Sequence, residues 1–345
     1  MEKLKYTRVE ECCEILDSMR IPITASDRKE GKYPYYGANG IQDYVNDYIF
    51  DDELVLLAED GGNFGSKEKP IAYRVSGKCW VNNHAHVLKP KEEIDVDYLC
   101  YSLMFYKVDG MINGATRKKL TQTAMKKMKI PLRNIVEQKK IVQQLNKIIE
   151  IREKAKKELN LLDNLIQARF VEMFGDPITN SKLLPIEKIE ERYFLKAGIT
   201  TKAEDIHDYL KDKYEIPCYG GNGIRGYVEN LSYEGCYPII GRQGALCGNV
   251  QYATGKFHAT EHAVLVSTLK NDNTMWVYYM LKLMDLYRYH TGAAQPGLAV
   301  KKLNTIDVIV ADINLQNQFA AFVHQINKSK FEVQKSLEKT QLLYD

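Results

Sequence analysis

The sequence has no paired cysteine motif and no long apolar run, and each absence excludes a class of protein. Its seven cysteines are odd in number and show no C-x-x-C spacing, which argues against a disulfide framework and against a zinc knuckle. No apolar stretch approaches the roughly 18 residues that span a membrane, and residues 1–20 alternate charged with apolar side chains instead of forming a signal-peptide core. We therefore expect a folded cytoplasmic protein with free thiols and no membrane partner.

The motifs of several enzyme classes are missing as well. Adenine methyltransferases carry an Asn/Asp-Pro-Pro-aromatic loop, but Asp176-Pro-Ile lacks the second proline. Gly255-Lys256 is followed by Phe257 and lacks the glycine spacing of a P-loop, and no G-x-S-x-G nucleophile elbow occurs. We expect a chain that is not an enzyme and that holds no cofactor of its own.

Two histidine patterns raise the question of a metal site. His258-Ala-Thr-Glu-His262 matches the H-x-x-E-H pattern of zinc proteases, which requires one helical face. The preceding Gly255 and the apolar residues 263–267 favour a loop that enters a strand instead. His84 and His86 could share one face of a strand, but no third ligand is evident. We expect no metal, with a zinc hydrolase as the weaker alternative.

Basic residues are clustered although the net charge is only +3. Between Gly110 and Val136 there is no acid, and the seven basic residues are Arg117, Lys118, Lys119, Lys126, Lys127, Lys129 and Arg133. Such a cluster is either a solvated face or a surface that binds phosphate.

The second half of the chain repeats the first at a shift of about 180 residues, which indicates an internal duplication. The matching segments keep their order: residues 33–41 with 216–224, 83–86 with 261–264, 114–120 with 292–298, and 130–142 with 308–320. In each copy, short alternating apolar stretches punctuated by glycine predict strands, and a long helix follows. The strand candidates are Glu53–Ala58, His84–Leu88, Tyr237–Gly241 and His262–Ser267.

The two long helices show matching heptad seams, in which apolar residues recur at steps of four and three. The first seam contains Ile141, Leu145, Ile148, Arg152, Ala155, Leu159, Leu162 and Ile166, and the second contains Phe319, Val323, Ile326, Lys330, Val333, Leu337, Thr340 and Tyr344. Each helix could lie on the core of its own domain, but matching seams favour an antiparallel coiled coil between them. This predicts an α+β protein in which two repeated mixed α/β domains are separated by two antiparallel helices and related by a pseudo-twofold axis.

Several motifs together resemble the target-recognition domains of type I restriction-modification specificity subunits. Gly292-Ala-Ala-Gln-Pro-Gly-Leu298, leading through Lys301-Lys-Leu303 to residues 306–310, is similar to the end of such a domain. Ile239-Ile-Gly-Arg-Gln-Gly-Ala245 resembles the Gly-Arg-x-Gly loop of that family, and the repeated Tyr-Gly-x-Asn-Gly-Ile resembles its domain entry. Residues 131–175 resemble its central helical region. The first copy departs from the pattern, with Glu59-Asp-Gly-Gly62 and Thr116-Arg-Lys-Lys119 at the corresponding loops.

The resemblance implies a DNA-binding specificity subunit that recognises a bipartite asymmetric target and directs adenine methylation or cleavage by partner subunits. The implied partners are double-stranded DNA, two methylation subunits and restriction subunits, with S-adenosylmethionine, ATP and Mg on those partners. The expected segments are 1–133 and 181–310 as recognition domains, with 134–180 and 311–345 as helical regions. A coiled-coil scaffold or adhesin-like protein that binds protein or glycan is the main alternative.

Specificity requires hydrogen-bonding side chains on rigid loops that reach base edges. The candidate base contacts are Asn39, Asn82, Asn83, His84, Asn222, Arg242, Gln243 and Gln295. Further candidate DNA contacts, without an assigned role, are Tyr36, Tyr219, Arg225 and His258. The candidate phosphate contacts are Arg117, Lys118, Lys119, Lys301 and Lys302. Asn39 and Asn222 precede glycines and are equally well explained as turn residues, and Tyr36 and Tyr219 as core aromatics.

Overall fold

The computed structural model describes residues 4–114, 117–210, 214–292 and 296–344, with the backbone alone for 341–344. The chain divides into two compact units, and the boundary between them along the chain lies between Ile151 and Arg152. Because this division falls inside one long helix, the four segments expected from the sequence stay a prediction. Among the described residues, no helix is long and apolar enough to cross a membrane.

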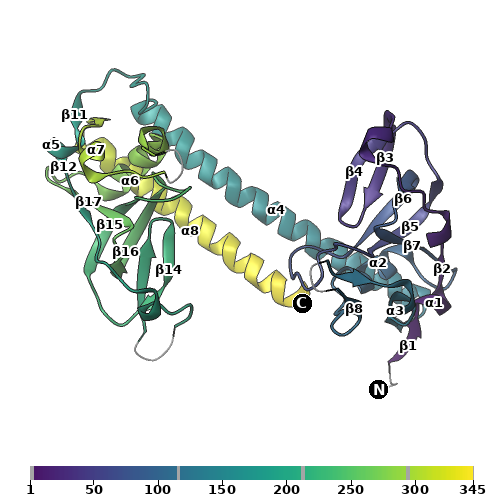
Figure 1. The fold of residues 1–345 in the computed structure, drawn as a ribbon. Helices are drawn as coiled ribbons and strands as arrows, with labels where there is room; N and C mark the ends of the chain where they lie inside the picture. The colour runs from purple at the N-terminus through teal and green to yellow at the C-terminus, as the bar shows by residue number, and fades with distance from the viewer. Residues whose placement is uncertain (1–3, 115–116, 211–213, 293–295, 345) are drawn as a thin grey trace. The chain divides into compact units, whose positions relative to one another are not determined.

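Unit 1 contains a mixed sheet with short helices and the start of a long helix (Figure 1). Its strands are β1 (Lys5–Arg8), β2 (Cys13–Ile15), β3 (Glu30–Gly37), β4 (Gly40–Val45), β5 (Phe50–Ala58), β6 (Ala72–Val81), β7 (Ala85–Pro90), β8 (Ile112–Asn113), β9 (Lys119–Leu120) and β10 (Lys129–Leu132). Its helices are α1 (Val9–Cys12), η1 (Asp17–Met19), η2 (Ala25–Asp27), α2 (Val96–Met104), α3 (Gln122–Lys126) and the first part of α4 (Ile135–Phe174).

Unit 2 has nearly the same order of elements. Its strands are β11 (Ile186–Lys188), β12 (Tyr193–Ala197), β13 (Ile216–Gly220), β14 (Gly223–Val228), β15 (Tyr233–Gly241), β16 (Val250–Ala259), β17 (Ala263–Thr268) and β18 (Asp307–Ile309). Its helices are α5 (Ile189–Arg192), η3 (Ala203–Asp205), α6 (Thr274–Leu283), η4 (Leu286–Tyr289), α7 (Val300–Asn304) and α8 (Ile313–Tyr344), together with the second part of α4.

The two sheets have the same topology, which confirms the duplication. The strand order is β2-β7-β5-β6-β3-β4 in unit 1 and β12-β17-β15-β16-β13-β14 in unit 2. In each sheet one pair is parallel, β3 with β6 or β13 with β16, and the other pairs are antiparallel. The predicted strands are all present, with ends shifted by a few residues. The α+β class is therefore confirmed.

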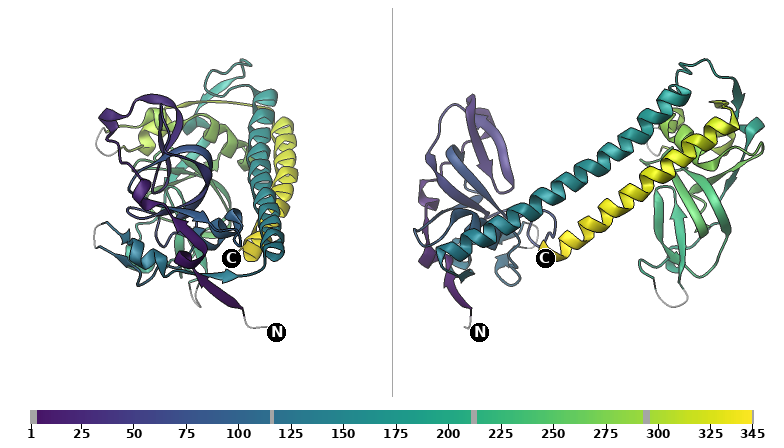
Figure 2. Two further views of the ribbon diagram at one scale, coloured as in Figure 1. Left: turned by 90° about the vertical axis from the view of Figure 1, so that its right-hand side faces the viewer. Right: turned by 180° about the vertical axis from the view of Figure 1, so that it is seen from behind.

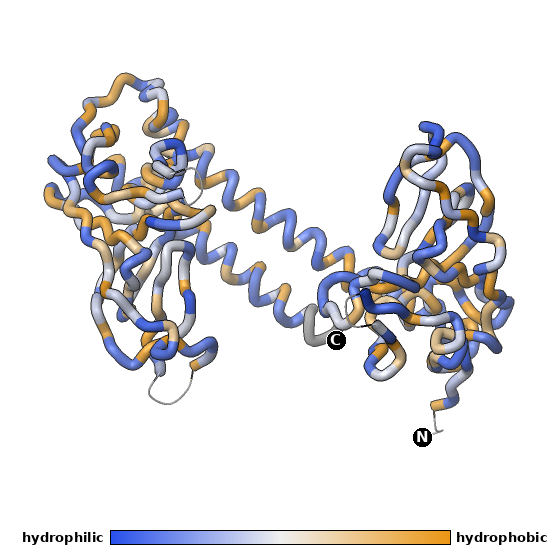
Figure 3. Tube along the Cα trace, in the orientation of Figure 1, coloured by the Kyte–Doolittle hydropathy of each residue, from blue (hydrophilic) through white to orange (hydrophobic). Residues whose placement is uncertain are grey.

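The central strand of the first sheet is buried on both faces. Leu54, Leu56 and their neighbours face one apolar cluster, while Val55 and Leu57 face another beneath α2. A strand covered on both sides is typically a continuous apolar run rather than an alternating one, and residues 54–58 form such a run. The tube in Figure 3 accordingly shows hydrophobic colour along the inner strands of each unit and mostly hydrophilic colour along the middle of the long helices.

The heptad seams are confirmed by burial. Each described side chain of both seams is buried or partly buried, whereas Ile151, Leu161 and Leu165, which lie off the first seam, are exposed. Within unit 2, α4 and α8 are antiparallel and lie side by side (Figure 2), because Phe170 packs on Phe319 near the sheet and Asp163 pairs with Lys330 further out. Lys330, the polar residue of the second seam, therefore forms an ion pair across the helices, with its Nζ 2.6 Å from Asp163 Oδ1.

A buried glutamine fixes the start of each long helix to its own domain. Gln138 donates to the carbonyls of Glu93 and Arg133 and accepts from the amide of Asp95, and its side chain is fully buried. Gln316 in α8 likewise accepts from the amide of Asn273, which caps α6 as Asp95 caps α2. All hydrogen-bonding atoms of such a buried amide must be satisfied, so the glutamine fixes the helix direction.

Candidate nucleic-acid interface

Loops from four parts of unit 1 meet at one end of its sheet. They are the turn at 38–39, residues 59–62, residues 82–84 and residues 117–120. The Asn39 side-chain amide donates to the Gly61 carbonyl at 3.1 Å, and the Leu120 amide donates to the Glu59 carbonyl at 2.7 Å. The Glu59 amide in turn donates to the His84 carbonyl at 2.9 Å. These hydrogen bonds join the loops into one surface, which we name the unit 1 loop cluster.

The equivalent loops of unit 2 meet in the same way. The Arg242 amide donates to the His262 carbonyl, and the Arg242 carbonyl accepts from the Leu298 amide at 2.8 Å. Gly221 packs so closely on Gly241 that an added Cβ on Gly241 would lie 2.2 Å from the Gly221 carbonyl oxygen. Only glycine permits this approach at Gly241. The unit 2 loop cluster therefore consists of residues 221–222, 241–244, 260–262 and 296–298.

The two clusters carry their charges on different loops. In unit 1, Asp60 forms an ion pair with Arg117, and Glu59 forms one with Lys119 at 3.1 Å. In unit 2, Arg242 and Gln243 stand where unit 1 has Glu59 and Asp60, and the facing residues Pro296 and Gly297 are neutral. Each cluster thus presents positively charged side chains beside amide side chains. The charged side chains belong to residues 117–119 in unit 1, but Arg242 of unit 2 belongs to the loop that faces the equivalent segment.

Most of the candidate contact residues lie on these two surfaces. Asn39, Asn83, Arg117, Lys118, Lys119, Asn222, Arg225 and Gln243 are exposed, and His84 and Arg242 are partly buried. Gln295 lies outside the described residues. The structure therefore brings together side chains that the sequence places far apart, but it does not by itself assign a base or a phosphate to any of them.

Two candidates are buried and hydrogen-bonded within the protein. His258 lies in β16 with its ring nitrogens on Thr201 and Ser232, and burial lowers its pKa below the usual 6.5. Asn82 accepts from the His84 amide and donates to Gln42. Both side chains hold loops in place, and neither presents a free edge to DNA, which corrects their assignment as contacts. The apolar neighbours Phe257 and Ala259 could have indicated the burial of His258, whereas Asn82 is followed by two polar residues and carried no such signal.

The two tyrosines are partly buried and pack against an apolar cluster of their sheet, in line with the alternative that they are core aromatics. Tyr36 packs on Tyr73, and Tyr219 packs edge-on against Phe257 at a centroid distance of 5.5 Å. Burial raises the pKa of both phenols. Their position under the glycine turns explains the repeated Tyr-Gly pair without a DNA contact.

Lys301 and Lys302 do not occupy the loop that matches Lys118 and Lys119. They lie on α7, which begins after Ala299, and Lys302 lines a hollow with Pro177 and Ile178. The residues that do correspond to Lys118 and Lys119 are Pro296 and Gly297. Lys301 and Lys302 therefore lie next to that loop, and their role as phosphate contacts stays a prediction.

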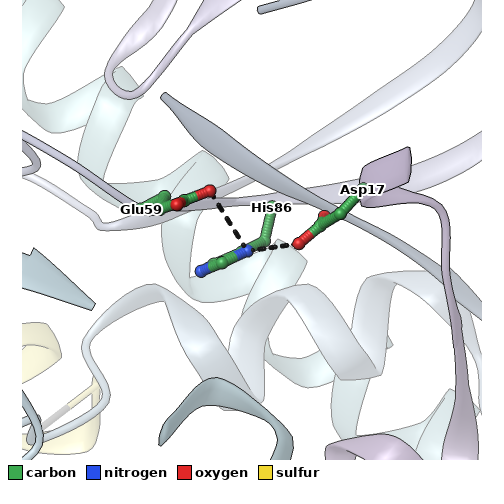
Figure 4. A group of neighbouring side chains, drawn as sticks. All are labelled: Asp17, Glu59 and His86. Carbon is green, nitrogen blue, oxygen red and sulfur yellow. Dashed lines mark hydrogen bonds and ion pairs between the residues drawn. The ribbon is translucent and has the colours of Figure 1, made fainter. Parts of the chain in front are cut away.

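A buried charged network lies beneath the unit 1 loop cluster (Figure 4). His86 Nδ1 lies 2.7 Å from Asp17 Oδ2 and 3.6 Å from Glu59 Oε2, while Nε2 lies 2.9 Å from the Leu120 carbonyl oxygen. Arg20 donates to Glu59 at 2.7 Å. His86 is fully buried, so its contact with the Leu120 carbonyl ties the strand β7 to the loop that carries the basic residues.

This network fits an internal ion-pair cluster better than a metal site. Asp17, Glu59 and His86 offer ligand atoms within 4.8 Å of one another. However, Arg20 already contacts Glu59 at 2.7 Å and Asp17 at 3.5 Å, and Lys119 contacts Glu59. A cation would have to displace both positive side chains. The sequence pointed to His86 but missed its partners, because Asp17 lies 69 residues away.

Unit 2 has no counterpart of this network. The sheet registers place Ala197 where unit 1 has Asp17 and Val264 where it has His86. Arg242, of opposite charge, stands at the position of Glu59. An apolar core therefore supports one loop cluster and a charged core supports the other.

We expect Asp17→Asn to destabilise unit 1 at neutral pH but much less in acid. Burial alone would raise the pKa of Asp17, but His86, Gln122 and the Val87 amide hold it below its ordinary 3.8. A carboxyl with a lowered folded-state pKa stabilises the fold above its ordinary pKa and loses that contribution as the pH falls through the lowered value. Urea unfolding of both proteins between about pH 7 and pH 2 measures the difference. A difference independent of pH would contradict the ionised role of Asp17.

The H-x-x-E-H pattern forms no helix. His258 lies in the strand β16, which ends at Ala259, and residues 260–262 form the turn into β17, so the expected loop that enters a strand is present at 260–262. Glu261 contacts His262 at 3.2 Å, while His258 faces Thr201 and Ser232. The three side chains therefore lack the shared helical face that a protease zinc site needs.

Comparison with known proteins gives the family. A family model described as the type I restriction modification DNA specificity domain matches residues 1–161 and 194–342. The chain is 46% identical over 133 residues to the type I restriction enzyme EcoprrI specificity subunit of Escherichia coli, which covers 39% of this chain and 33% of that protein. It is 35% identical over 144 residues to a putative specificity subunit of Haemophilus influenzae, covering 42% and 37%. The matched regions thus span about a third of each relative.

Solved structures agree on the fold. The S subunit of a type I restriction-modification system from M. genitalium superposes with a TM-score of 0.66 at 15% identity, covering 100% of this chain and 95% of that one. A chain from a study of complex assembly in a type I system gives a TM-score of 0.58 at 14% identity, covering 100% and 97%. Since the family model covers most of the sequence in both units, the chain belongs to the type I restriction modification DNA specificity domain family.

Proposed function

We propose that this chain is a sequence-specific DNA-binding subunit that recognises a bipartite, asymmetric target, each loop cluster reading one half. The observation that carries the proposal is the duplication of one rigid loop cluster whose cations and amides differ between the copies. Arg, Asn and Gln are the side chains that pair with base edges, and lysines bind phosphates without reading sequence. Two different surfaces in one chain suit two different half-sites.

The proposal includes partners that supply the chemistry. Two methylation subunits that hold S-adenosylmethionine and restriction subunits that use ATP and Mg would act on the DNA that this non-catalytic chain selects. The exposed apolar side chains Ile151, Leu161 and Leu165, off the seam of α4, offer area for such contacts. We also propose that the protein is cytoplasmic and has no membrane partner.

Enrichment of a random-sequence duplex library on the full chain tests the proposed function. We expect two short specified segments separated by an unspecified gap, and binding that weakens steeply with salt because phosphates are neutralised. A scaffold that binds protein or glycan would enrich no sequence. That outcome would favour the alternative class.

The lysine Lys118 is expected to bind phosphate. It is exposed, and Lys118→Ala should weaken binding to all sequences alike and reduce the slope of log affinity against log salt by about 0.9. The matched control is Lys157→Ala, which removes an exposed lysine of α4 that belongs to neither loop cluster. Titration of duplex DNA at several salt concentrations measures both. Equal effects of the two variants would contradict a specific role of the loop.

The exposed Gln243 is expected to read a base. Gln243→Ala should relax discrimination at one position of one half-site by about 1–3 kcal/mol, since a bidentate amide contact to adenine is lost. Competition between the enriched target and single-base variants measures this loss. A uniform loss at all positions would assign Gln243 to the backbone instead.

A further inference from the structure

Arg117 is the one candidate contact of unit 1 whose guanidinium is oriented by two other side chains. Its Nε forms an ion pair with Asp60 Oδ1, and its Nη2 lies 3.4 Å from His84 Nδ1. Both contacts use the edge of the guanidinium formed by Nε and Nη2. The outer fork, formed by Nη1 and Nη2, remains for a further acceptor, because the side chain is 60% exposed.

The surrounding backbone holds this geometry in place. Gly61 has a φ of +69°, and a Cβ added there would lie 3.5 Å from Arg117 Nε, so the arginine lies over the glycine. The Gly61 amide donates to the Lys118 carbonyl at 3.2 Å, and its carbonyl accepts from Asn39. Beneath the loop, His86 anchors the Leu120 carbonyl. The arginine therefore extends from a loop that is fixed from below and from both sides.

The charge balance distinguishes a base contact from a phosphate contact. A phosphate contact gains most of its energy from the net positive charge of the side chain. Asp60 cancels that charge but leaves the direction of the remaining N–H donors unchanged. The acceptors O6 and N7 of guanine are neutral and demand direction rather than charge, and a guanidinium fork matches their spacing.

We propose that Arg117 reads a guanine in one half-site through its outer fork, and that Asp60 is the positioning residue that orients it. This inference rests on the proposed DNA-binding function and changes the role of Arg117, which the sequence grouped with the phosphate contacts. Unit 2 would use a different solution, because Arg242 comes from the opposite loop and Pro296 and Gly297 face it.

The decisive variant is Arg117→Lys, which keeps the charge but removes the fork. The full-length wild type and the variant are each incubated with a random-sequence duplex library, and base preferences are read position by position. We expect the variant to lose preference for guanine at one position of one half-site by about 5- to 150-fold, with other positions unchanged. Lys118→Ala is the matched control, and it should lower affinity without changing any base preference.

The variant Asp60→Asn tests the positioning role. We expect it to weaken the same guanine preference while binding to unrelated DNA rises and its salt slope steepens by up to about 0.9, because Arg117 regains its net charge. A merely structural role for Asp60 would lower stability and leave the salt slope unchanged. Such a result would overturn the positioning assignment.

The failures of the two proposals are distinguishable. If the wild type enriches no sequence, the proposed function fails and this inference fails with it. If the wild type enriches a bipartite sequence and Arg117→Lys enriches the same one with equal preference, only the guanine contact is overturned, and Arg117 then binds phosphate.

Discussion

Phe170→Ala is expected to lower the free energy of unfolding of unit 2 by about 3–5 kcal/mol. Phe170 is fully buried and contacts Phe174, Trp276 and Phe319, with ring centroids 5.0, 6.4 and 5.3 Å away. It joins α4 to α8 and to the helix α6 on the sheet, so a cavity there loosens three elements at once. Chemical denaturation of the full chain, followed by circular dichroism, measures the loss.

The matched control is Leu165→Ala on the same helix. Leu165 is 46% exposed and lies off the seam, so its removal should change stability by no more than about 0.5 kcal/mol. Equal destabilisation by the two variants would show that α4 does not pack through the seam face. A small effect of Phe170→Ala alone would show the same.

Asp272→Ala is expected to destabilise unit 2 by about 3–5 kcal/mol, because it leaves a buried arginine without its counter-ion. Asp272 accepts from Arg192 Nε at 2.5 Å and from Nη2 at 2.6 Å, and Gln316 donates to the same carboxylate. Burial alone would lower the pKa of Arg192, but the hydrogen bonds and the charge of Asp272 raise it above its ordinary value. Thermal unfolding measures the destabilisation.

Unit 1 provides the control for this pair. Cys12 stands where unit 2 has Arg192, and Ile94 stands where it has Asp272, and both are buried in an apolar cluster. The double variant Arg192→Cys with Asp272→Ile copies that solution and should recover most of the stability lost in Asp272→Ala, since no charge is left buried. No recovery would indicate that the ion pair itself, rather than the unpaired charge, determines the effect.

The base and phosphate roles were only partly predictable from the sequence. Composition and spacing correctly placed Arg117, Lys118 and Gln243 on exposed loops, because charged and amide residues beside glycine favour turns. They failed for His258 and Asn82, which are polar like the exposed candidates but are buried. The direction of a loop side chain depends on what packs beneath the loop, and that information comes from other parts of the chain.

The sequence by itself determined the duplication, the α+β class and the two heptad seams. These features repeat along the chain: a helix seam recurs every three or four residues, and a buried strand is a short apolar run. They depend on local spacing alone. The same reasoning separated the H-x-x-E-H pattern from a metal helix, because the flanking glycine and β-branched residues are local too.

Only the tertiary structure decided which distant residues meet. The sheet places β7 between β2 and β5, so Asp17, Glu59 and His86 become neighbours although 69 residues separate the first from the last. The contact of Asp60 with Arg117 arises in the same way, since the backbone of residues 117–120 hydrogen-bonds to that of residues 59–61. No periodic sequence pattern predicts which strands pair across such separations. The ion pairs depend on that pairing, because buried charges are stable only beside a partner.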